Sequence, residues 1–228
     1  MNIAIPDIEL PPISIALPAA NARHTSNDSD YGTPQAIVES ARKVMGGIAL
    51  DPASSEEHNR LVRAKHIYTA ADDGFAKPWR ARSVFLNPPG GLSDNQQRPV
   101  KRECRVTGAC GLPLPHTHDG VESSQKKWWR KLVREWASDR TRQAVFVCFS
   151  VELLQTTQSG ADEHDGLPLE FAICYPRVRL AYLKGGVPAA APPHASCIVY
   201  LPPLENPEKA KLKFREEFRQ HGHVVVPR

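Results

Sequence analysis

The sequence lacks a strong excess of charge of either sign, a long uncharged apolar run and an even number of cysteines. Its 29 basic and 25 acidic side chains give a net charge of +4, which excludes a histone-like protein, so any nucleic-acid contact must come from a local patch. The apolar N-terminus, MNIAIPDIELPPISIALPAA, carries acids and prolines and no basic leading region, so it fits neither a signal peptide nor a spanning helix. We therefore expect no membrane contact.

Cysteines are few and odd in number. There are five cysteines in 228 residues, and Cys148, Cys174 and Cys197 each lie in an apolar run where a small hydrophobic residue would serve. This distribution argues against the disulfide framework of a small secreted protein. We expect a cytoplasmic protein with reduced thiols.

The chain divides into an arm and one domain. Residues 1–30 contain four prolines and then the polar tract HTSNDSD, which predicts an extended or disordered arm. The remainder, residues 31–228, has room for one sizeable core. Thr33 offers a helix cap with Pro34 at the first helical position, and apolar residues at helical spacing follow as far as Gly46. These features predict an amphipathic helix at the start of the domain.

Short apolar runs alternate with helices and predict buried strands. Two runs end at Asp51 and Asn87, each indicating a parallel strand with a polar residue at its carboxyl end. A helix from about 207 to 220, closed by Gly222, precedes the last strand. Further strand candidates lie at 144–149, 171–175, 197–201 and 224–226. The pattern predicts an open α/β sheet with helices on both faces and ligands at the carboxyl edge.

Residues at about 91–124 interrupt this alternation and are interpreted as an insertion. Four side chains of the kind that zinc binds tetrahedrally lie in CRVTGACGLPLPHTHDG: Cys104, Cys110, His116 and His118. Four ligands leave no position for water, so the ion would be structural and would brace a DNA-contacting loop. The spacing lacks a Cys-x-x-Cys knuckle, and a flexible insertion with two free thiols is the alternative.

The stretch VFLNPPGG places Asn87 between an apolar strand and two prolines. An exocyclic amine on a nucleobase is a poor nucleophile because its lone pair is delocalised into the ring. The amide oxygen of Asn87 and a neighbouring main-chain carbonyl can accept both amine hydrogens, while Pro88 and Pro89 fix the backbone without donating a competing N–H. The same tripeptide also serves simply to end a strand.

Four ordered segments resemble the phage-type DNA N6-adenine methyltransferases, the Dam-like family. They are Thr33-Pro34-Gln35, LDPASS at 50–55, ADDGFAKPW at 71–79 and VFLNPP at 84–89. The resemblance implies an enzyme of a bacterial or phage-infected cell that methylates adenine in double-stranded DNA. It also implies S-adenosylmethionine as cofactor and a Rossmann-like methyltransferase sheet. A cytosine-N4 methyltransferase and an inactive DNA-binding phage accessory protein stay open.

The match also implies site residues. The target amine would be held by Asn87, Pro88 and Pro89, and the cofactor by Thr33, Pro34, Asp51, Pro52, Ala53 and Asp72 or Asp73. A helix cap or a solvated turn is the alternative role for the aspartates. The chain departs from the family in two places: Gly90 replaces the aromatic that stacks on the flipped base, and Ala53 and Ser54 replace glycines.

The run SSQKKWWRKLVREWASDRTR predicts a helix with two unlike faces. One is apolar: Trp129, Leu132, Val133 and Trp136. The opposite face carries four cations: Lys127, Arg130, Lys131 and Arg134. Such a stripe would bind DNA phosphates beside an extruded base, and a merely solvated surface is the alternative. Trp128 lies outside the apolar face and would stack on a base or pack at the core edge. The sequence leaves the oligomeric state open.

Overall fold

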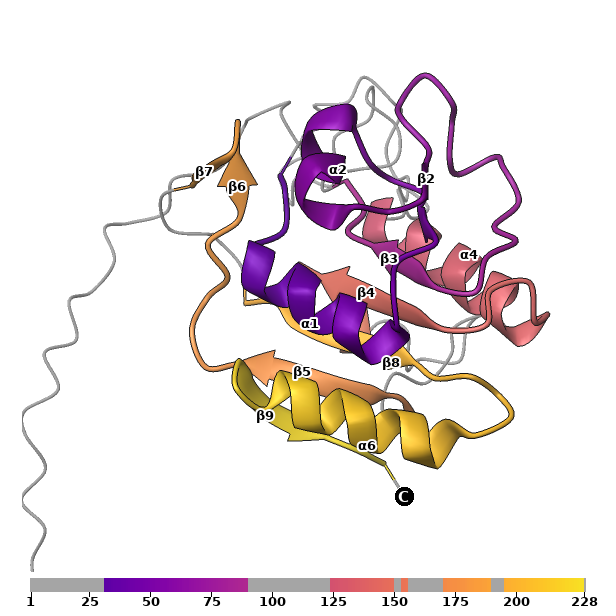
Figure 1. Ribbon diagram of the computed structural model, residues 1–228, viewed down its shortest axis with the longest axis vertical. Helices are drawn as coiled ribbons and strands as arrows, with labels where there is room; N and C mark the ends of the chain where they lie inside the picture. Colours follow the sequence, from indigo (N-terminus) through magenta and orange to yellow (C-terminus); the bar gives the residue numbers. More distant parts are fainter. Residues whose placement is uncertain (1–30, 90–123, 150–152, 156–169, 190–194, 228) are drawn as a thin grey trace, which may run out of the picture.

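A computed structural model describes residues 31–89, 124–149, 153–155, 170–189 and 195–227. One sheet is built from β1 (Leu50–Asp51), β2 (His66–Ile67), β3 (Val84–Leu86), β4 (Ala144–Cys148), β5 (Ala172–Pro176), β8 (Cys197–Leu201) and β9 (Gly222–Val225). A separate hairpin is formed by β6 (Leu183–Lys184) and β7 (Val187–Pro188). The sheet order is β2-β1-β3-β4-β8-β5-β9 (Figure 1).

The sheet is mostly parallel. Strands β2, β1, β3 and β4 pair in parallel, and β8 runs antiparallel to both β4 and β5, so β5 points the same way as β4. β9 runs antiparallel to β5, which leaves five of the seven strands in one direction. This mixed α/β sheet confirms the expected fold class and is compatible with a Rossmann-like fold. Because β1 and β3 are parallel neighbours, their carboxyl ends meet at one edge.

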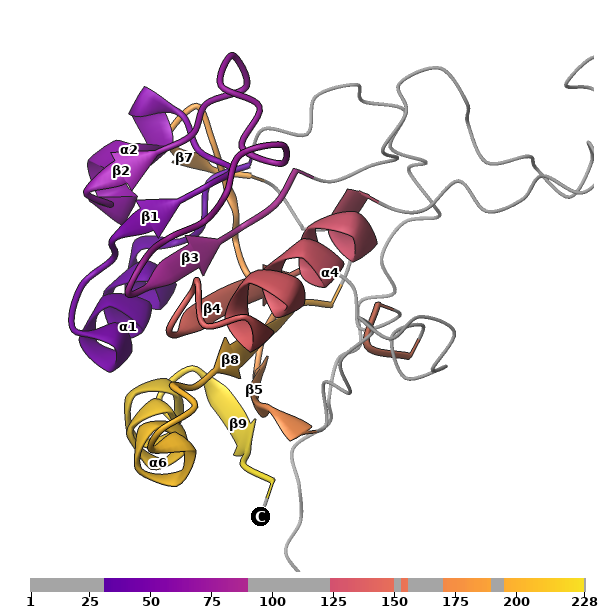
Figure 2. The ribbon, with the colours of Figure 1, turned by 90° about the vertical axis from the view of Figure 1, so that its right-hand side faces the viewer.

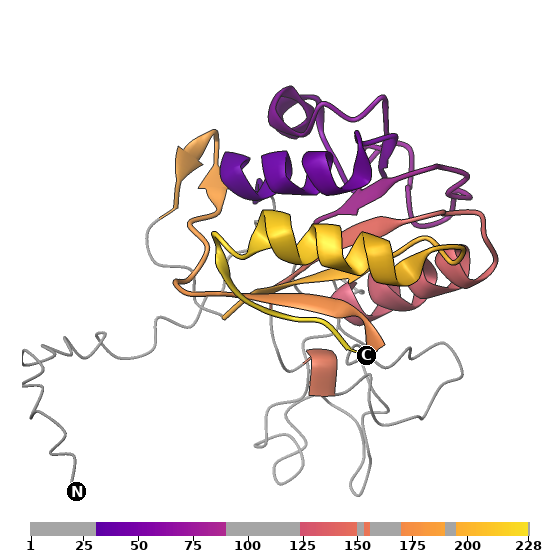
Figure 3. The same ribbon diagram turned by 60° about the horizontal axis from the view of Figure 1, so that its bottom comes forward.

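Helices cover both faces, as expected. The described helices include α1 (Gln35–Met45), α2 (Glu56–Val62), α4 (Ser124–Ala137) and α6 (Pro207–Phe218). Helices α1 and α6 lie side by side on one face and α4 lies on the other (Figures 2 and 3). Strand residues alternate between the two cores: Phe85 packs in the core of α1 and α6, whereas Leu86 packs with Trp129 of α4. The alternation fixes which side of each strand faces which helix.

The two predicted helix ends differ in outcome. Gly46 is the C-cap of α1 at φ 71°, and the N–H of Gly47 also bonds to the carbonyl of Arg42, as a left-handed helix end requires. Gly222 does not close α6, so that prediction is wrong: the helix ends at Phe218 and Gly222 begins β9. A Cβ at position 222 would lie 1.9 Å from the carbonyl oxygen of Tyr175, so this glycine allows β9 to approach β5.

Candidate functional site

Asn87 follows β3 directly and is held in one orientation. Its Nδ2 donates a hydrogen bond of 2.8 Å to the main-chain carbonyl of Tyr31. Because Nδ2 faces the carbonyl of Tyr31, Oδ1 points in the opposite direction. Oδ1 is buried and has no hydrogen-bond partner among the described residues. The side chain therefore presents an oriented, desolvated acceptor, which costs free energy until a donor reaches it.

The carbonyl that holds Asn87 is itself anchored by the β6–β7 hairpin. The residue after Tyr31, Gly32, exchanges two main-chain hydrogen bonds of 2.8 Å with Leu183. A Cβ on Gly32 would lie 3.2 Å from the imidazole Cδ2 of His58, so a larger residue would crowd this junction. The orientation of Asn87 thus depends on a strand pairing that brings residues 32 and 183 together.

Asp51 ends β1, beside the end of β3. The side chain is 3% exposed, and its Oδ1 accepts a 3.2 Å hydrogen bond from the N–H of Ala53. Burial raises the pKa of this carboxyl to about 7, although the hydrogen bonds from Ala53 and the Ser54 hydroxyl lower it in part. Asp51 is therefore poised between its neutral and anionic forms near neutral pH.

Thr33 does not cap α1, so that prediction is wrong. The helix begins at Gln35 with Pro34 as its N-cap, and no side chain makes a cap hydrogen bond. Pro34 takes extended backbone angles, φ −55° and ψ 138°, which places Thr33 one residue too early to reach the first turn. Its hydroxyl is instead buried without a hydrogen-bond partner in the described part of the chain.

The side chains of Asn87, Asp51 and Thr33 line one small cavity, here called the strand-end hollow. The cavity measures about 30 Å³, room for one or two water-sized groups. Four of the predicted site residues line it, namely Thr33, Asp51, Ala53 and Asn87, whereas Pro34, Pro52, Pro88 and Pro89 do not. The other lining residues are Gly32, Glu57, His58, Leu61, Val62, Phe85, Leu183 and Gly186. The two buried oxygens, which have no hydrogen-bond partner in the described part of the chain, suit a ligand that brings N–H groups, and the anionic form of the Asp51 carboxyl suits positive charge.

No protein-family profile, curated protein or solved structure matches this chain.

Asp72 and Asp73 do not line the strand-end hollow. Both oxygens of Asp72 are engaged locally: Oδ2 accepts from the N–H and hydroxyl of Thr69, and Oδ1 pairs with Lys77 at 3.1 Å. These bonds lower the pKa of Asp72 to about 2. Asp73 has a left-handed backbone at φ 51° and accepts from the N–H of Ala76, as turn residues do. These local hydrogen bonds favour the alternative role of Asp72 and Asp73 as turn residues.

The ADDGFAKPW segment nevertheless packs on the LDPASS segment. A Cβ at Gly74 would lie 1.9 Å from the carbonyl oxygen of Pro52, so the two backbones touch. The buried indole of Trp79 donates a 2.8 Å hydrogen bond to the carbonyl of Gly74 and holds the loop there. The loop thus supports the turn that follows Asp51 and Pro52.

The basic helix α4 has the predicted apolar face but an uneven charged face. Trp129, Leu132 and Val133 are buried, and Trp136 packs against them, as expected. Arg134 is exposed and Lys127 is partly exposed.

Lys131 is only 14% exposed and pairs with Glu135 at 3.1 Å. Its Nζ also lies 5.0 Å from the Trp79 ring centre. Lys131 therefore belongs to the packing of α4 rather than to an open stripe. Trp128 stacks on Trp79 at 5.7 Å and 18°, which supports the core-edge alternative for it.

Several predictions fall outside the described residues. They concern the arm at 1–30, the insertion with Cys104, Cys110, His116 and His118, and Gly90. Within the described ranges, no group of three or more metal-binding side chains comes together, and no helix is long and apolar enough to cross a membrane. Cys148, Cys174 and Cys197 are buried and form no disulfide in these ranges, as their apolar context predicts.

Eight residues that line the strand-end hollow were not predicted as site residues, among them His58, Leu183 and Gly186. His58 lies on α2, whose N-cap Ser55 accepts from the N–H of His58 at 3.1 Å. The SSEE sequence before His58 is a capping signal that predicts such a helix. Leu183 and Gly186 come from a short hairpin, and the glycine pair 185–186 with positive φ is its only local sequence signal.

Proposed function

We propose that this protein is an S-adenosylmethionine-dependent methyltransferase that modifies an exocyclic amino group in DNA, with adenine N6 as the target. The observation that carries the proposal is the buried Oδ1 of Asn87, which has no hydrogen-bond partner among the described residues and is oriented by the bond from Nδ2 to Tyr31. An amino group that enters the strand-end hollow would supply the missing donor. The ordered motifs described above support the same reaction.

Asn87 would act by accepting a hydrogen bond. With the Pro88 carbonyl as second acceptor, it would draw both amine hydrogens toward the protein and leave the nitrogen lone pair facing the methyl donor. Tyr31 prevents the amide from turning its own N–H groups toward the amine, where they would repel it. A pre-oriented acceptor needs no rearrangement during the reaction.

S-adenosylmethionine, when bound, supplies a methyl group activated by a positively charged sulfur. Thr33, Pro34, Asp51, Pro52 and Ala53 would hold it. The Thr33 hydroxyl, which has no hydrogen-bond partner within the described ranges, and the Asp51 carboxyl in its anionic form suit its polar, cationic end. The strand-end hollow is far smaller than the roughly 300–1,000 Å³ of whole-ligand pockets. It admits the reacting groups, while the bulk of the base and cofactor would lie outside it.

DNA would be gripped by the outward cations of α4. Lys127, Arg130 and Arg134 would contact DNA phosphates, whereas Lys131 packs against Glu135 and Trp79. Cytosine N4 is the second candidate, because the same pair of acceptors would hold either amine.

The test is incubation with S-adenosylmethionine and unmethylated DNA, followed by mass analysis of the nucleosides. N6-methyladenine should form with the wild type, and Asn87→Ala should lower its rate by about 10²–10³-fold, the usual effect of removing one oriented hydrogen-bonding group. Asn206→Ala is the matched control, because Asn206 is exposed and its side chain makes no cap hydrogen bond. Its rate should equal that of the wild type.

Calorimetric titration with S-adenosylmethionine separates the alternatives. Cofactor binding with N4-methylcytosine as product would move the target to cytosine. Cofactor binding without any methylated nucleoside, or an Asn87→Ala variant as active as the wild type, would refute the proposed chemistry. Absence of cofactor binding would favour the DNA-binding accessory protein.

A further inference from the structure

A second, larger cavity lies at the opposite edge of the sheet, here called the α1–α6 hollow. It measures about 440 Å³, within the range of small-molecule sites. Met45 and Gly46 end α1 before β1, and Gln143 precedes β4, so the cavity sits at the amino ends of the parallel strands. Asn87 and Asp51 lie at the carboxyl ends. The α1–α6 hollow is therefore separate from the proposed methyl-transfer site.

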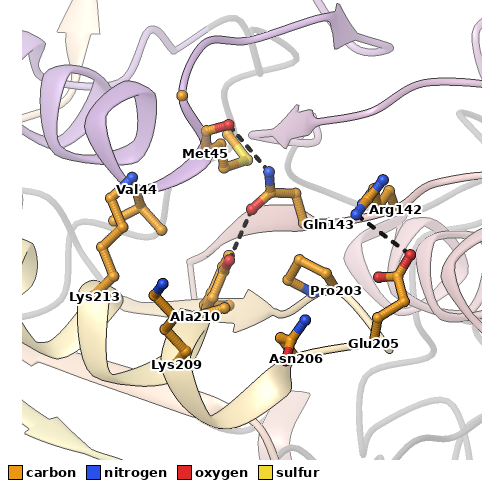
Figure 4. Close-up of a pocket in the computed structure, with 12 residues that line it drawn as sticks. Val44, Met45, Arg142, Gln143, Pro203, Glu205, Asn206, Lys209, Ala210 and Lys213 are labelled. Carbon is orange, nitrogen blue, oxygen red and sulfur yellow. Dashed lines mark hydrogen bonds and ion pairs between the residues drawn. The ribbon is translucent and has the colours of Figure 1, made fainter.

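The inner wall of the α1–α6 hollow is apolar and rigid. Val44, Met45 and Tyr200 are buried there. Both ends of the Gln143 amide are engaged: Nε2 donates to the carbonyl of Met45 at 3.0 Å, and Oε1 accepts from the Tyr200 hydroxyl at 2.8 Å (Figure 4). Because these polar groups satisfy one another, the wall is preformed and offers mainly apolar contact.

The outer wall carries uncompensated positive charge. Arg142 pairs with Glu205 at 3.3 Å, which neutralises both. Lys209 and Lys213 lie one turn apart on α6 and extend toward α1 (Figure 4), and neither has an ion-pair partner within the described residues. Like charges at this spacing repel each other. An anion between them would remove that repulsion.

We propose that the α1–α6 hollow binds a small organic anion, with its apolar body against Met45 and Tyr200 and its phosphate or carboxylate between Lys209 and Lys213. Neither part alone would suffice: a neutral apolar molecule leaves the lysines unpaired, and a bare phosphate leaves the apolar wall uncovered. This site goes beyond the proposed methyltransferase function and does not depend on it.

The experiment is calorimetric titration with 1-naphthyl phosphate, compared with 1-naphthol and inorganic phosphate. We expect saturable one-to-one binding of 1-naphthyl phosphate and weaker binding of either fragment. The double variant Lys209→Gln/Lys213→Gln should weaken binding by about tenfold, since two exposed charge contacts are lost. Ala210→Phe, which fills the cavity and keeps both lysines, should abolish binding.

The matched control is Lys65→Gln/Arg215→Gln, which removes the same charge from exposed positions outside the cavity. Its affinity for 1-naphthyl phosphate should stay within about twofold of the wild type. If this control lost as much affinity as the Lys209/Lys213 variant, the loss would be due to the change in net charge alone. Absence of saturable binding, or unchanged affinity in the Lys209/Lys213 variant, would overturn the site. Heat denaturation of each variant checks that the fold is intact.

Discussion

Because the carboxyl of Asp51 is buried, we predict that the stability of the protein depends on pH. Its pKa is about 7 in the folded protein, against 3.8 for an unburied aspartate. Between these pH values the folded chain keeps a proton that the unfolded chain releases, so the free energy of unfolding falls as pH rises from about 4 to about 7. Each pH unit is worth about 1.4 kcal/mol, which makes the total loss about 4 kcal/mol. Above pH 7 the contribution is constant.

Replacing the carboxyl by an amide should remove this pH dependence. Asparagine keeps an oxygen for the N–H of Ala53 and carries no charge to desolvate. We expect Asp51→Asn to match the wild type near pH 3.5 and to be more stable by up to about 4 kcal/mol at pH 8. Urea unfolding at a series of pH values measures the difference directly.

Asp72→Asn is the control, with the opposite sign. The pKa of Asp72 is lowered to about 2 by Thr69 and Lys77, so its contribution to stability is present above about pH 4 and lost as pH falls toward 2. This variant should gain nothing at pH 8. If Asp51→Asn and the wild type kept the same slope between pH 4 and 7, Asp51 would already be ionised there, and the argument for a titratable carboxyl at the site would be refuted.

Five further substitutions test separate parts of the structure. Gly74→Ala should destabilise the protein by about 3 kcal/mol because its Cβ would overlap a carbonyl oxygen, whereas Gly46→Ala, which meets open space, should cost only about 1 kcal/mol; urea midpoints compare the two. Thr33→Val should leave stability unchanged or raise it by about 1 kcal/mol while weakening S-adenosylmethionine binding in calorimetry, and unaltered binding would remove Thr33 from the site. Lys131→Gln should lower the free energy of unfolding by about 1–2 kcal/mol in urea without a specific loss of DNA affinity in filter binding. Arg134→Gln should weaken DNA binding without lowering stability. The opposite result for the two variants would show that Lys131 contacts DNA.

The sequence predicted the elements that have a strong local signal. The apolar run before Asn87 became β3, the periodic run before Gly46 became α1, and strand 197–201 has the predicted bounds. In each case one local pattern, either alternation with helices or helical spacing, determines the element. The positions of Asp51 and Asn87 at one edge followed from parallel pairing alone.

Other features depend on distant parts of the chain and could not be predicted locally. The role of Thr33 changed because Pro34 itself became the cap. Gly222 resembles a helix end in sequence, yet the carbonyl that requires a glycine there belongs to Tyr175, in another strand. Lys131 looked like surface charge because the Trp79 ring, which is distant in sequence, reaches it only after folding; its pairing with Glu135 follows the local i,i+4 spacing of the helix.

The position of β8 between β4 and β5 determines when the sheet can be completed. During synthesis β4 and β5 emerge first, and each keeps an open edge of main-chain N–H and carbonyl groups until residues 197–201 leave the ribosome. In a nascent chain stalled before that point, β4 can pair with β3 and keeps one open edge, whereas β5 has both edges open because β9 also follows later in the chain. Such open apolar edges favour association with other chains.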